Sequence, residues 1–274
     1  MTEKKIQIHP KVHQHIKNQE NLISKLRTNL PNFFDFKTMI SKGNDETDLS
    51  EFYSFVALNH PKSASQLFQD LFVAFSFGQK ERGTFLEFGA TDGVSLSNSF
   101  FLENKLKWKG VLAEPSPQWH QKLIQNRPNS HLVFDCIWTE TGLELDFFVS
   151  DFGVLSTIDA YRESDKLSMP GNTAARIKSG HNVKVKTKSL NDIFVEFFNS
   201  SPIDYMSVDT EGSELDILSN FDFDKFGPSI LTVEHNFTAL QDGIDKLLFA
   251  NGYVRRFKDF TAFDAWYIRP NAFE

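Results

Sequence analysis

The stretch Phe85-Leu86-Glu87-Phe88-Gly89-Ala90-Thr91-Asp92-Gly93 decides the fold, because an apolar run ends there in a glycine turn with an acid on each side. The apolar run predicts a buried strand, and the turn predicts the passage from that strand into a helix. In open parallel sheets, ligands bind at turns of this kind. A dinucleotide fingerprint requires G-x-G-x-x-G, and Thr91 replaces its second glycine, so the stretch does not favour pyrophosphate binding.

Strand-like and helix-like segments alternate on both sides of this turn. The expected helices cover residues 66–77, 97–105, 119–126, 190–198, 214–218 and 244–250. The expected strands cover residues 84–89, 110–115, 131–138, 143–149, 183–186, 203–208 and 229–233, and a hairpin-like pair at 253–257 and 266–268 ends the chain. This alternation predicts an α/β domain whose parallel strands are joined by right-handed crossovers.

The chain is expected to divide near residue 50. Apolar residues recur at helical spacing between Val12 and Leu30, which predicts an amphipathic helix that Pro31 ends. That helix packs either on the main domain or on a second copy of the chain, as a homodimer contact. A polar, acidic stretch at 42–51 predicts a linker, so 1–50 is interpreted as a helical extension and 51–274 as the main domain. Residues 151–182 have few large apolar side chains and predict a long loop or lid.

Charge and composition exclude several classes of protein. The 274 residues carry 29 basic and 36 acidic side chains, for a formal net charge of −7, so no broad basic field is present to bind nucleic acid. Cys136 is the single cysteine, which excludes an intramolecular disulfide and a cysteine zinc site. The N-terminus lacks the apolar stretch of a secretory signal, and no run reaches the roughly 18 apolar residues of a membrane span. We therefore expect a cytoplasmic protein.

Two acids at successive strand ends indicate the class of ligand. Glu87 ends the first strand, where a carboxylate favours a cationic amino-acid or sulfonium group over a phosphate. Glu114 ends the next strand, where a carboxylate can accept both hydroxyls of a ribose. Together these features fit S-adenosylmethionine better than a nicotinamide dinucleotide.

A second group of polar residues follows two later strands. The apolar run 203–208 ends in Asp209-Thr210-Glu211-Gly212, and the run 230–233 ends in Glu234-His235-Asn236. In a sheet of this order the two strands are neighbours, and their carboxyl ends meet at one edge. We therefore expect one crevice to be surrounded by Asp209, Glu211, Glu234, His235 and Asn236.

Two mechanisms would use this crevice to methylate a hydroxyl group. A sugar hydroxyl has a pKa near that of water, so its methylation requires a base, or a cation that stabilises the developing alkoxide. In the first mechanism His235 takes the proton while Glu211 or Glu234 fixes its tautomer. In the second, Asp209, Glu211 and His235 bind Mg²⁺ or Mn²⁺. The sequence leaves both open, with Asp209, Glu211 and His235 as the expected catalytic residues.

Six stretches carry a resemblance to a known family. They are 65–72 (SQLFQDLF), 85–93 (FLEFGATDG), 96–99 (LSNS), 108–115 (WKGVLAEP), 207–214 (SVDTEGSE) and 233–236 (VEHN). As an ordered set they resemble the FkbM family of methyltransferases over residues 60–269. The resemblance implies a class I methyltransferase fold, which is Rossmann-like and has a seven-stranded, mostly parallel sheet with one antiparallel strand. Many relatives carry Asn where Thr91 stands, a change that leaves the backbone role of this position intact.

The same resemblance implies S-adenosylmethionine as the methyl donor. The turn at 87–93 would hold its methionine part and Glu114 its ribose. The full set of donor-binding residues expected from the resemblance is Glu87, Gly89, Ala90, Asp92, Gly93, Ser97, Glu114, Pro115 and Asp135. The metal-dependent mechanism is similar to that of the catechol O-methyltransferases, in which residues at the same two strand ends hold the ion.

The resemblance also implies a carbohydrate acceptor, as a nucleotide-linked sugar or a surface glycan precursor. Five residues of the 151–182 loop either bind nucleotide phosphates or face solvent: Arg162, Lys166, Arg176, Lys178 and His181. Two alternatives stay open. One is a different acceptor, such as a phosphate-derived group or a polyketide hydroxyl, and the other is a non-catalytic scaffold that binds the donor.

Overall fold

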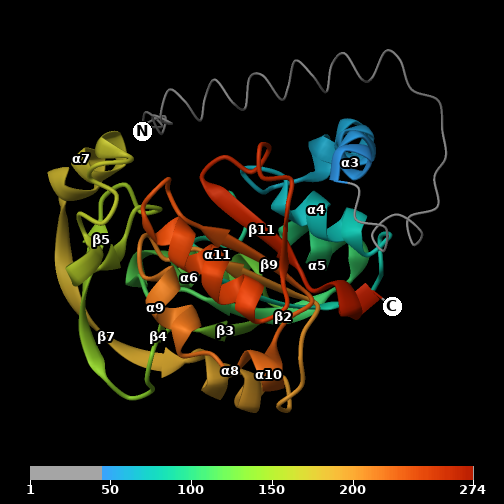
Figure 1. Ribbon diagram of the computed structural model, residues 1–274. Coiled ribbons are helices and arrows are strands. Elements are labelled where there is room, and N and C mark those ends of the chain that lie inside the picture. Colours follow the sequence, from blue (N-terminus) through green and yellow to red (C-terminus); the bar gives the residue numbers. More distant parts are fainter. Residues whose placement is uncertain (1–44, 274) are drawn as a thin grey trace.

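The computed structural model describes residues 45–273 (Figure 1). The helix expected between Val12 and Leu30, and the dimer contact suggested for it, lie outside these residues. The helices are α3 (Asp45–Asn59), α4 (Gln69–Ser76), α5 (Phe100–Leu106), α6 (Pro117–Asn126), α7 (Pro170–Lys178), α8 (Leu190–Phe197), α9 (Glu214–Ser219), α10 (Phe223–Phe226) and α11 (Leu240–Ala250). Short 3-10 helices are η1 (His60–Lys62), η2 (Asp159–Tyr161) and η3 (Pro270–Phe273).

A seven-stranded sheet forms the centre of the molecule. Its spatial order is β10 (Val254–Arg256), β11 (Asp264–Ile268), β9 (Ile230–Glu234), β8 (Tyr205–Val208), β1 (Thr84–Phe88), β2 (Lys109–Ala113) and β3 (His131–Val133). Strand β11 runs antiparallel to both of its neighbours, and the other pairs are parallel. The chain order reverses between β1 and β8, which is where open α/β sheets bind ligands. The expected class I methyltransferase topology is thus confirmed.

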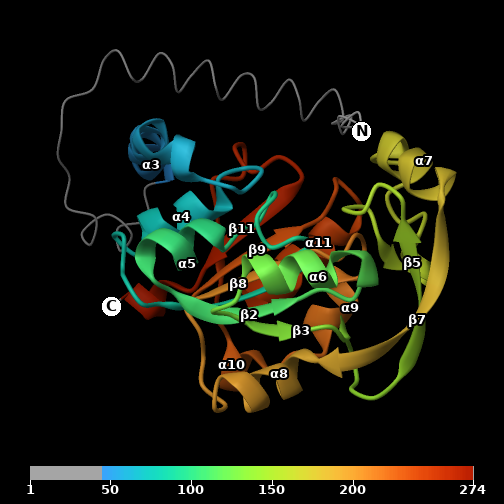
Figure 2. The same cartoon turned by 180° about the vertical axis from the view of Figure 1, so that it is seen from behind.

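Side chains alternate between the two faces of this sheet and build one hydrophobic core on each. On β1, Phe85 belongs to the first core and Leu86 to the second. Helices α3, α4, α5 and α6 contribute to the first core, and α8, α9, α10 and α11 to the second. Figure 1 shows α9 and α11 in front of the sheet, and the reverse view in Figure 2 shows α5 and α6 covering the other side.

A second, four-stranded sheet stands beside the strand ends. Its order is β4 (Cys136–Trp138), β7 (Gly180–Ser189), β5 (Glu144–Ser150) and β6 (Thr157–Ile158). Strand β6, η2, α7 and the start of β7 lie within the loop expected at 151–182. The strand expected at 131–138 is therefore split: β3 pairs in the main sheet and β4 pairs with β7. The long strand β7 reaches from α7 to α8 along the side of the molecule (Figure 1). Residues 151–178 are called the lid below.

The acidic stretch at 42–51 is not a linker in its described part, because α3 begins at Asp45. Asp48 is buried and forms an ion pair with Arg256, and Phe52 stacks on Phe257 with ring centroids 5.3 Å apart. The acidic composition of this stretch suggested a solvent-exposed linker, but the Asp48 carboxylate is buried in an ion pair. Helix α3 belongs to the main domain, so a boundary at residue 50 would cut through it.

The remaining sequence-based boundaries agree with the structure to within a few residues. The terminal pair expected at 253–257 and 266–268 is β10 and β11. Within residues 45–273, none of the helices has the length and apolar character that crossing a bilayer requires.

Candidate active site

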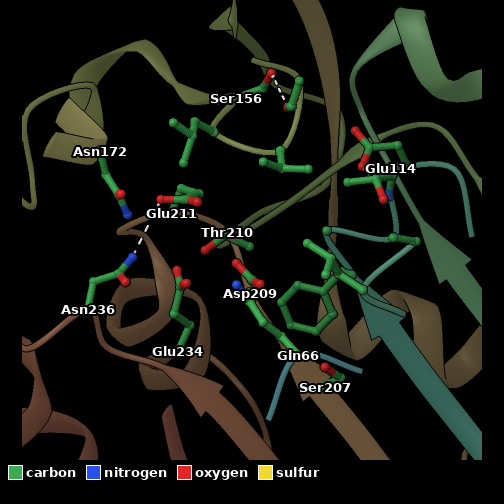
Figure 3. Close-up of a pocket in the computed structure, with 18 of the residues that line it drawn as sticks. Gln66, Glu114, Ser156, Asn172, Ser207, Asp209, Thr210, Glu211, Glu234 and Asn236 are labelled. Atoms are coloured by element: carbon green, nitrogen blue, oxygen red, sulfur yellow. Dashed lines mark hydrogen bonds between the residues drawn. The ribbon is translucent and has the colours of Figure 1, made fainter. Parts of the chain in front are cut away.

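A cavity of about 850 Å³ lies at the carboxyl ends of β1, β2, β8 and β9, and the lid forms its opposite wall (Figure 3). Its size falls in the range of small-molecule sites, about 300 to 1,000 Å³. Six acidic residues line it, namely Glu87, Glu114, Asp209, Glu211, Glu234 and Asp264. Among residues 45–273, Lys178 is the one basic residue of the lining. This excess of negative charge favours a cationic ligand.

The glycine turn at the end of β1 packs directly against Asp209, the residue that follows β8. Gly89 has φ +79°, and a Cβ atom placed there would lie 2.2 Å from the backbone oxygen of Asp209. Any side chain at this position would therefore push β1 away from β8. Gly93 closes the same turn, also at positive φ, and its carbonyl accepts a hydrogen bond of 2.8 Å from buried Arg127.

Glu87 anchors the loop that follows the turn. One carboxylate oxygen accepts hydrogen bonds from the hydroxyls of Ser97 (2.9 Å) and Ser99, and the other accepts the Asn98 N–H at 2.8 Å. The Arg127 guanidinium donates hydrogen bonds to the same two hydroxyls. Glu87 lines the cavity as expected, and its carboxylate also fixes the position of the 97–99 loop.

Glu114 is held at the end of β2 by two backbone groups. Its oxygens accept the N–H of Thr91 and the N–H of Ser116, each at 2.8 Å. Burial raises the pKa of Glu114 to about 7, although these two hydrogen bonds lower it. A carboxylate has about four acceptor sites, so two remain for ligand hydroxyls.

Three carboxylates from β8 and β9 converge at the other end of the cavity. Asp209, Glu211 and Glu234 each offer an oxygen, and these oxygens lie within 4.8 Å of one another (Figure 3). Burial raises the pKa of all three side chains. Their mutual repulsion raises the pKa values of Asp209 and Glu234 further, while the Arg176 guanidinium opposes the rise at Glu211. Like charges at such distances cannot all ionise without a compensating cation.

The backbone at the cavity is strained at four non-glycine residues. Thr91, Leu96, Glu211 and Asn236 have φ values of 48°, 63°, 62° and 46°, and each lines the cavity. Such conformations cost about 1 to 3 kcal/mol each and cluster at functional sites.

The lid is attached to this acidic end by Arg176 of α7. The fully buried guanidinium donates to Glu211 Oε2 at 2.5 Å and to Asp165 Oδ1 at 2.8 Å. It also donates to the carbonyl of Leu155 at 2.8 Å. Because all these partners belong to the protein, Arg176 does not bind phosphate as one sequence interpretation suggested.

The other four residues considered for phosphate binding differ in their surroundings. Arg162 pairs with Asp159, Lys166 pairs with Glu163 at 2.6 Å, and His181 lies beyond the lid, exposed on β7. Lys178 lies at the cavity and is exposed. Of the five residues considered for phosphate binding, only Lys178 lines the cavity.

His235 is not brought into the cavity, contrary to the expectation that it faces the crevice. Its Nδ1 accepts the Phe237 N–H at 3.1 Å, so Nε2 carries the proton and donates to the Asp264 carbonyl at 3.0 Å. Burial, together with the nearby Arg255, lowers its pKa to about 4. The side chain is thus neutral at pH 7 with both nitrogens occupied. Glu234 and Asn236, on either side of it, line the cavity instead.

The expected donor-binding residues fall into two groups. Glu87, Gly89, Ala90, Ser97, Glu114 and Pro115 line the cavity. Asp92 does not line it, and its carboxylate caps the turn by accepting the N–H groups of Val94 (2.9 Å) and Ser95 (2.7 Å). Gly93 shapes the turn without lining the cavity, and Asp135 lies in a separate shallow depression with three lysines of β7.

Several cavity residues were not predicted. Gln66, Gln69 and Asn98 lie within stretches that carried the family resemblance, so the signal was present but unassigned. Asp264 opens the antiparallel strand β11, and it accepts hydrogen bonds from Gln69 Nε2 (2.8 Å) and Trp266 Nε1 (3.1 Å). No motif surrounds Asp264 in the sequence, and only the strand order brings it here.

Comparisons with known proteins give one family and a set of distant structures. The model of the Methyltransferase FkbM domain matches residues 87–255, which is more than half of the chain. No curated protein matches the chain. An FkbM methyltransferase from Methylobacillus flagellatus KT has a TM-score of 0.45 and 13% identity, over 93% of this chain and 60% of that one. The chain thus spans 60% of the length of that relative.

Two further structures are similar at the same level. The SAH-bound Podospora anserina methyltransferase PaMTH1 has a TM-score of 0.41 and 11% identity, over 97% of this chain and 99% of that one. Aeropyrum pernix fibrillarin, with natively bound S-adenosyl-L-methionine, has a TM-score of 0.38 and 12% identity, over 74% of this chain and 73% of that one. The match over residues 87–255, which begins at Glu87 and includes Glu114 and the three clustered carboxylates, places this chain in the FkbM methyltransferase family.

Proposed function

We propose that the chain is an S-adenosylmethionine-dependent O-methyltransferase whose acceptor is a sugar hydroxyl, on a nucleotide-linked sugar or a surface glycan precursor. The observation that carries this proposal is the single cavity that joins Glu114 to the carboxylates of Asp209 and Glu234. A donor and an acceptor bound at its two ends would meet beside Gly89, where the turn touches Asp209.

The donor end is suited to a nucleoside with a cationic substituent. Glu114 would accept the ribose hydroxyls, and the closely packed turn at Gly89 would let the ligand approach the backbone. When bound, S-adenosylmethionine supplies an electrophilic methyl group on a positively charged sulfur. The six acidic residues of the lining favour that charge.

The acceptor end is suited to removing a proton from a hydroxyl. Burial and mutual repulsion raise the pKa values of Asp209 and Glu234, so whichever of the two is ionised is a stronger base than a carboxylate in water. The acceptor hydroxyl would give its proton to whichever of these two carboxylates is ionised, while the donor would supply the methyl group and leave as S-adenosylhomocysteine. The lid, which Arg176 ties to Glu211, would keep competing water out.

The charge of the cavity limits how an acceptor can enter. Hydroxyls can donate to the carboxylates and to the side-chain oxygens of Asn172 and Asn236, whereas a phosphate group would be repelled. A nucleotide-linked sugar would therefore insert its sugar and leave its diphosphate outside, near exposed Lys178.

The test has two steps. Calorimetry with S-adenosylhomocysteine measures donor binding, and incubation with methyl-labelled S-adenosylmethionine and a panel of nucleotide sugars measures transfer. We expect a product that is heavier by one CH₂, with the label on oxygen by NMR. Label on carbon, or transfer only to polyketide hydroxyls or phosphate-derived groups, would contradict the proposed acceptor. Binding without transfer to any member would favour a scaffold.

A further inference from the structure

The carboxylates of Asp209, Glu211 and Glu234 form a ligand set that differs from the one suggested by the sequence. The sequence interpretation used His235 as the third ligand, but both of its nitrogens are occupied outside the cavity. Glu234 takes its place, since its oxygen lies within 4.8 Å of those of the other two residues. We propose that these three carboxylates bind one divalent cation, Mg²⁺ or Mn²⁺.

An unpartnered atom points to a ligand at this position. Glu234 Oε2 is buried and accepts no hydrogen bond from a described N–H or O–H group, the Glu234 carboxyl group lies against another acid, Asp209, and the whole residue is only 8% exposed. A buried carboxylate oxygen without a partner costs free energy unless a cation or a donor occupies the adjacent space. Figure 3 shows this side chain directed toward Asp209 and Glu211.

The side-chain hydrogen bonds that hold Glu211 use only one of its two carboxylate oxygens. Arg176 (2.5 Å) and the Asn236 amide (3.5 Å) both donate to Oε2, so Oε1 is available to a further ligand. The Glu211 carbonyl accepts hydrogen bonds from Thr157 and Ser164 of the lid, each at 3.2 Å. These contacts orient a metal ligand in the way that outer-shell partners orient ligands in known metal sites.

The donor chemistry selects the kind of cation. All three side chains offer hard oxygen ligands, which suit Mg²⁺ and Mn²⁺, and neither His nor Cys belongs to the cluster. The Arg176 guanidinium is shared between Glu211 and Asp165, so it does not neutralise the three carboxylates, and a divalent ion would offset much of their remaining charge. The inference deepens the proposed function and rests on it for one point: a bound ion would stabilise the alkoxide of the acceptor, and a carboxylate oxygen that is not a metal ligand would take the proton.

Direct binding of Mn²⁺ to the full-length chain tests this inference without any turnover. The protein is stripped with EDTA, desalted and titrated with Mn²⁺, and free Mn²⁺ is measured by electron paramagnetic resonance. We expect one ion to bind with a Kd below about 1 mM. Glu234→Gln and Asp209→Asn are each expected to weaken binding about tenfold or more.

The matched control is Asp264→Asn, a buried acid of the same cavity that is not in the cluster. It should weaken Mn²⁺ binding much less than Glu234→Gln does. If both variants weaken Mn²⁺ binding equally, the ion is attracted by the overall negative charge of the cavity and not by three specific ligands. That result would overturn the inference. Absence of Mn²⁺ binding by folded wild-type protein would overturn it as well, in favour of carboxylates that share protons.

Thermal unfolding is a second measurement, and it can be made on variants that bind Mn²⁺ too weakly for the titration. Mn²⁺ should raise the Tm of the wild type, and at the same Mn²⁺ concentration it should raise that of Glu234→Gln by much less. Without metal, Glu234→Gln should raise the Tm, because one of three repelling carboxylates is removed. Calorimetry with S-adenosylhomocysteine in EDTA separates the two proposals. If the protein binds S-adenosylhomocysteine but not Mn²⁺, only the metal site is contradicted. If it binds Mn²⁺ but not S-adenosylhomocysteine, only the proposed function is contradicted.

Discussion

Arg176 of the lid donates to the Glu211 carboxylate at 2.5 Å, with the arginine side chain fully buried and the glutamate side chain 9% exposed. This ion pair joins the segment that covers the cavity to a residue of its acidic cluster. Because Asp165 and the Leu155 carbonyl bind the same guanidinium, one side chain organises a large part of the lid.

Replacing Arg176 with alanine should destabilise the protein by about 3 to 5 kcal/mol, because Asp165 and Glu211 would keep buried charges without a partner. Urea unfolding measures the change. Lys166→Ala removes an ion pair whose two side chains are 64% and 53% exposed, and its unfolding should match the wild type. Equal stability of the Arg176→Ala protein would show that the lid is held by other contacts.

Gly89→Ala should destabilise the protein by more than about 1 kcal/mol, since it combines a positive φ with a clash against Asp209. Gly142→Ala is the matched control because Gly142 also has positive φ (+88°) but has nothing within 4 Å of an added Cβ. Thermal and urea unfolding of both variants separate backbone strain from the close approach of β1 and β8. If the two changes cost the same free energy, the approach of β1 to β8 contributes nothing.

The affinity for S-adenosylhomocysteine should fall as the pH is lowered through about 7. The pKa of Glu114 is raised to about 7 by burial, and only its ionised form accepts both ribose hydroxyls. Affinity is thus highest above this pKa and declines below it. Glu114→Gln should bind about 10- to 100-fold more weakly at pH 8, with a flatter pH profile. A profile that is equally steep in Glu114→Gln would assign the titration to another group.

His235→Gln should change stability rather than donor binding. The Phe237 N–H and the Asp264 carbonyl would lose their partners, at a cost of about 1 to 3 kcal/mol, while the cavity lining stays the same. Urea unfolding and calorimetry with S-adenosylhomocysteine measure the two effects. Normal stability together with lost methyl transfer would restore His235 as a catalytic residue.

The sheet order could be predicted from the sequence because each apolar run between 84 and 233 is bounded by a polar turn, and the family motifs mark the strand ends. The cavity assignment of Glu87, Glu114, Asp209 and Glu211 follows from the same signal. His235 was misplaced, because β9 ends at Glu234 and the turn that follows, with Asn236 at φ 46°, directs its ring to the Asp264 carbonyl, which only the structure shows.

Long-range pairing explains what the sequence could not show. Asp48 looked like part of a solvated linker, and its partner Arg256 is 208 residues away. Asp264 reaches the cavity through the pairing of β11 with β9. The long strand β7 was expected only at 183–186, since Val183 and Val185 are its only large apolar residues, and the strand extends beyond them on both sides to Gly180 and Ser189.

A crystal structure with S-adenosylhomocysteine tests the central claim most directly. We predict that the ribose hydroxyls lie within hydrogen-bonding distance of Glu114 and that the sulfur points toward Asp209 and Glu234. A ligand bound outside this cavity, or a sulfur directed away from those two carboxylates, would contradict the account.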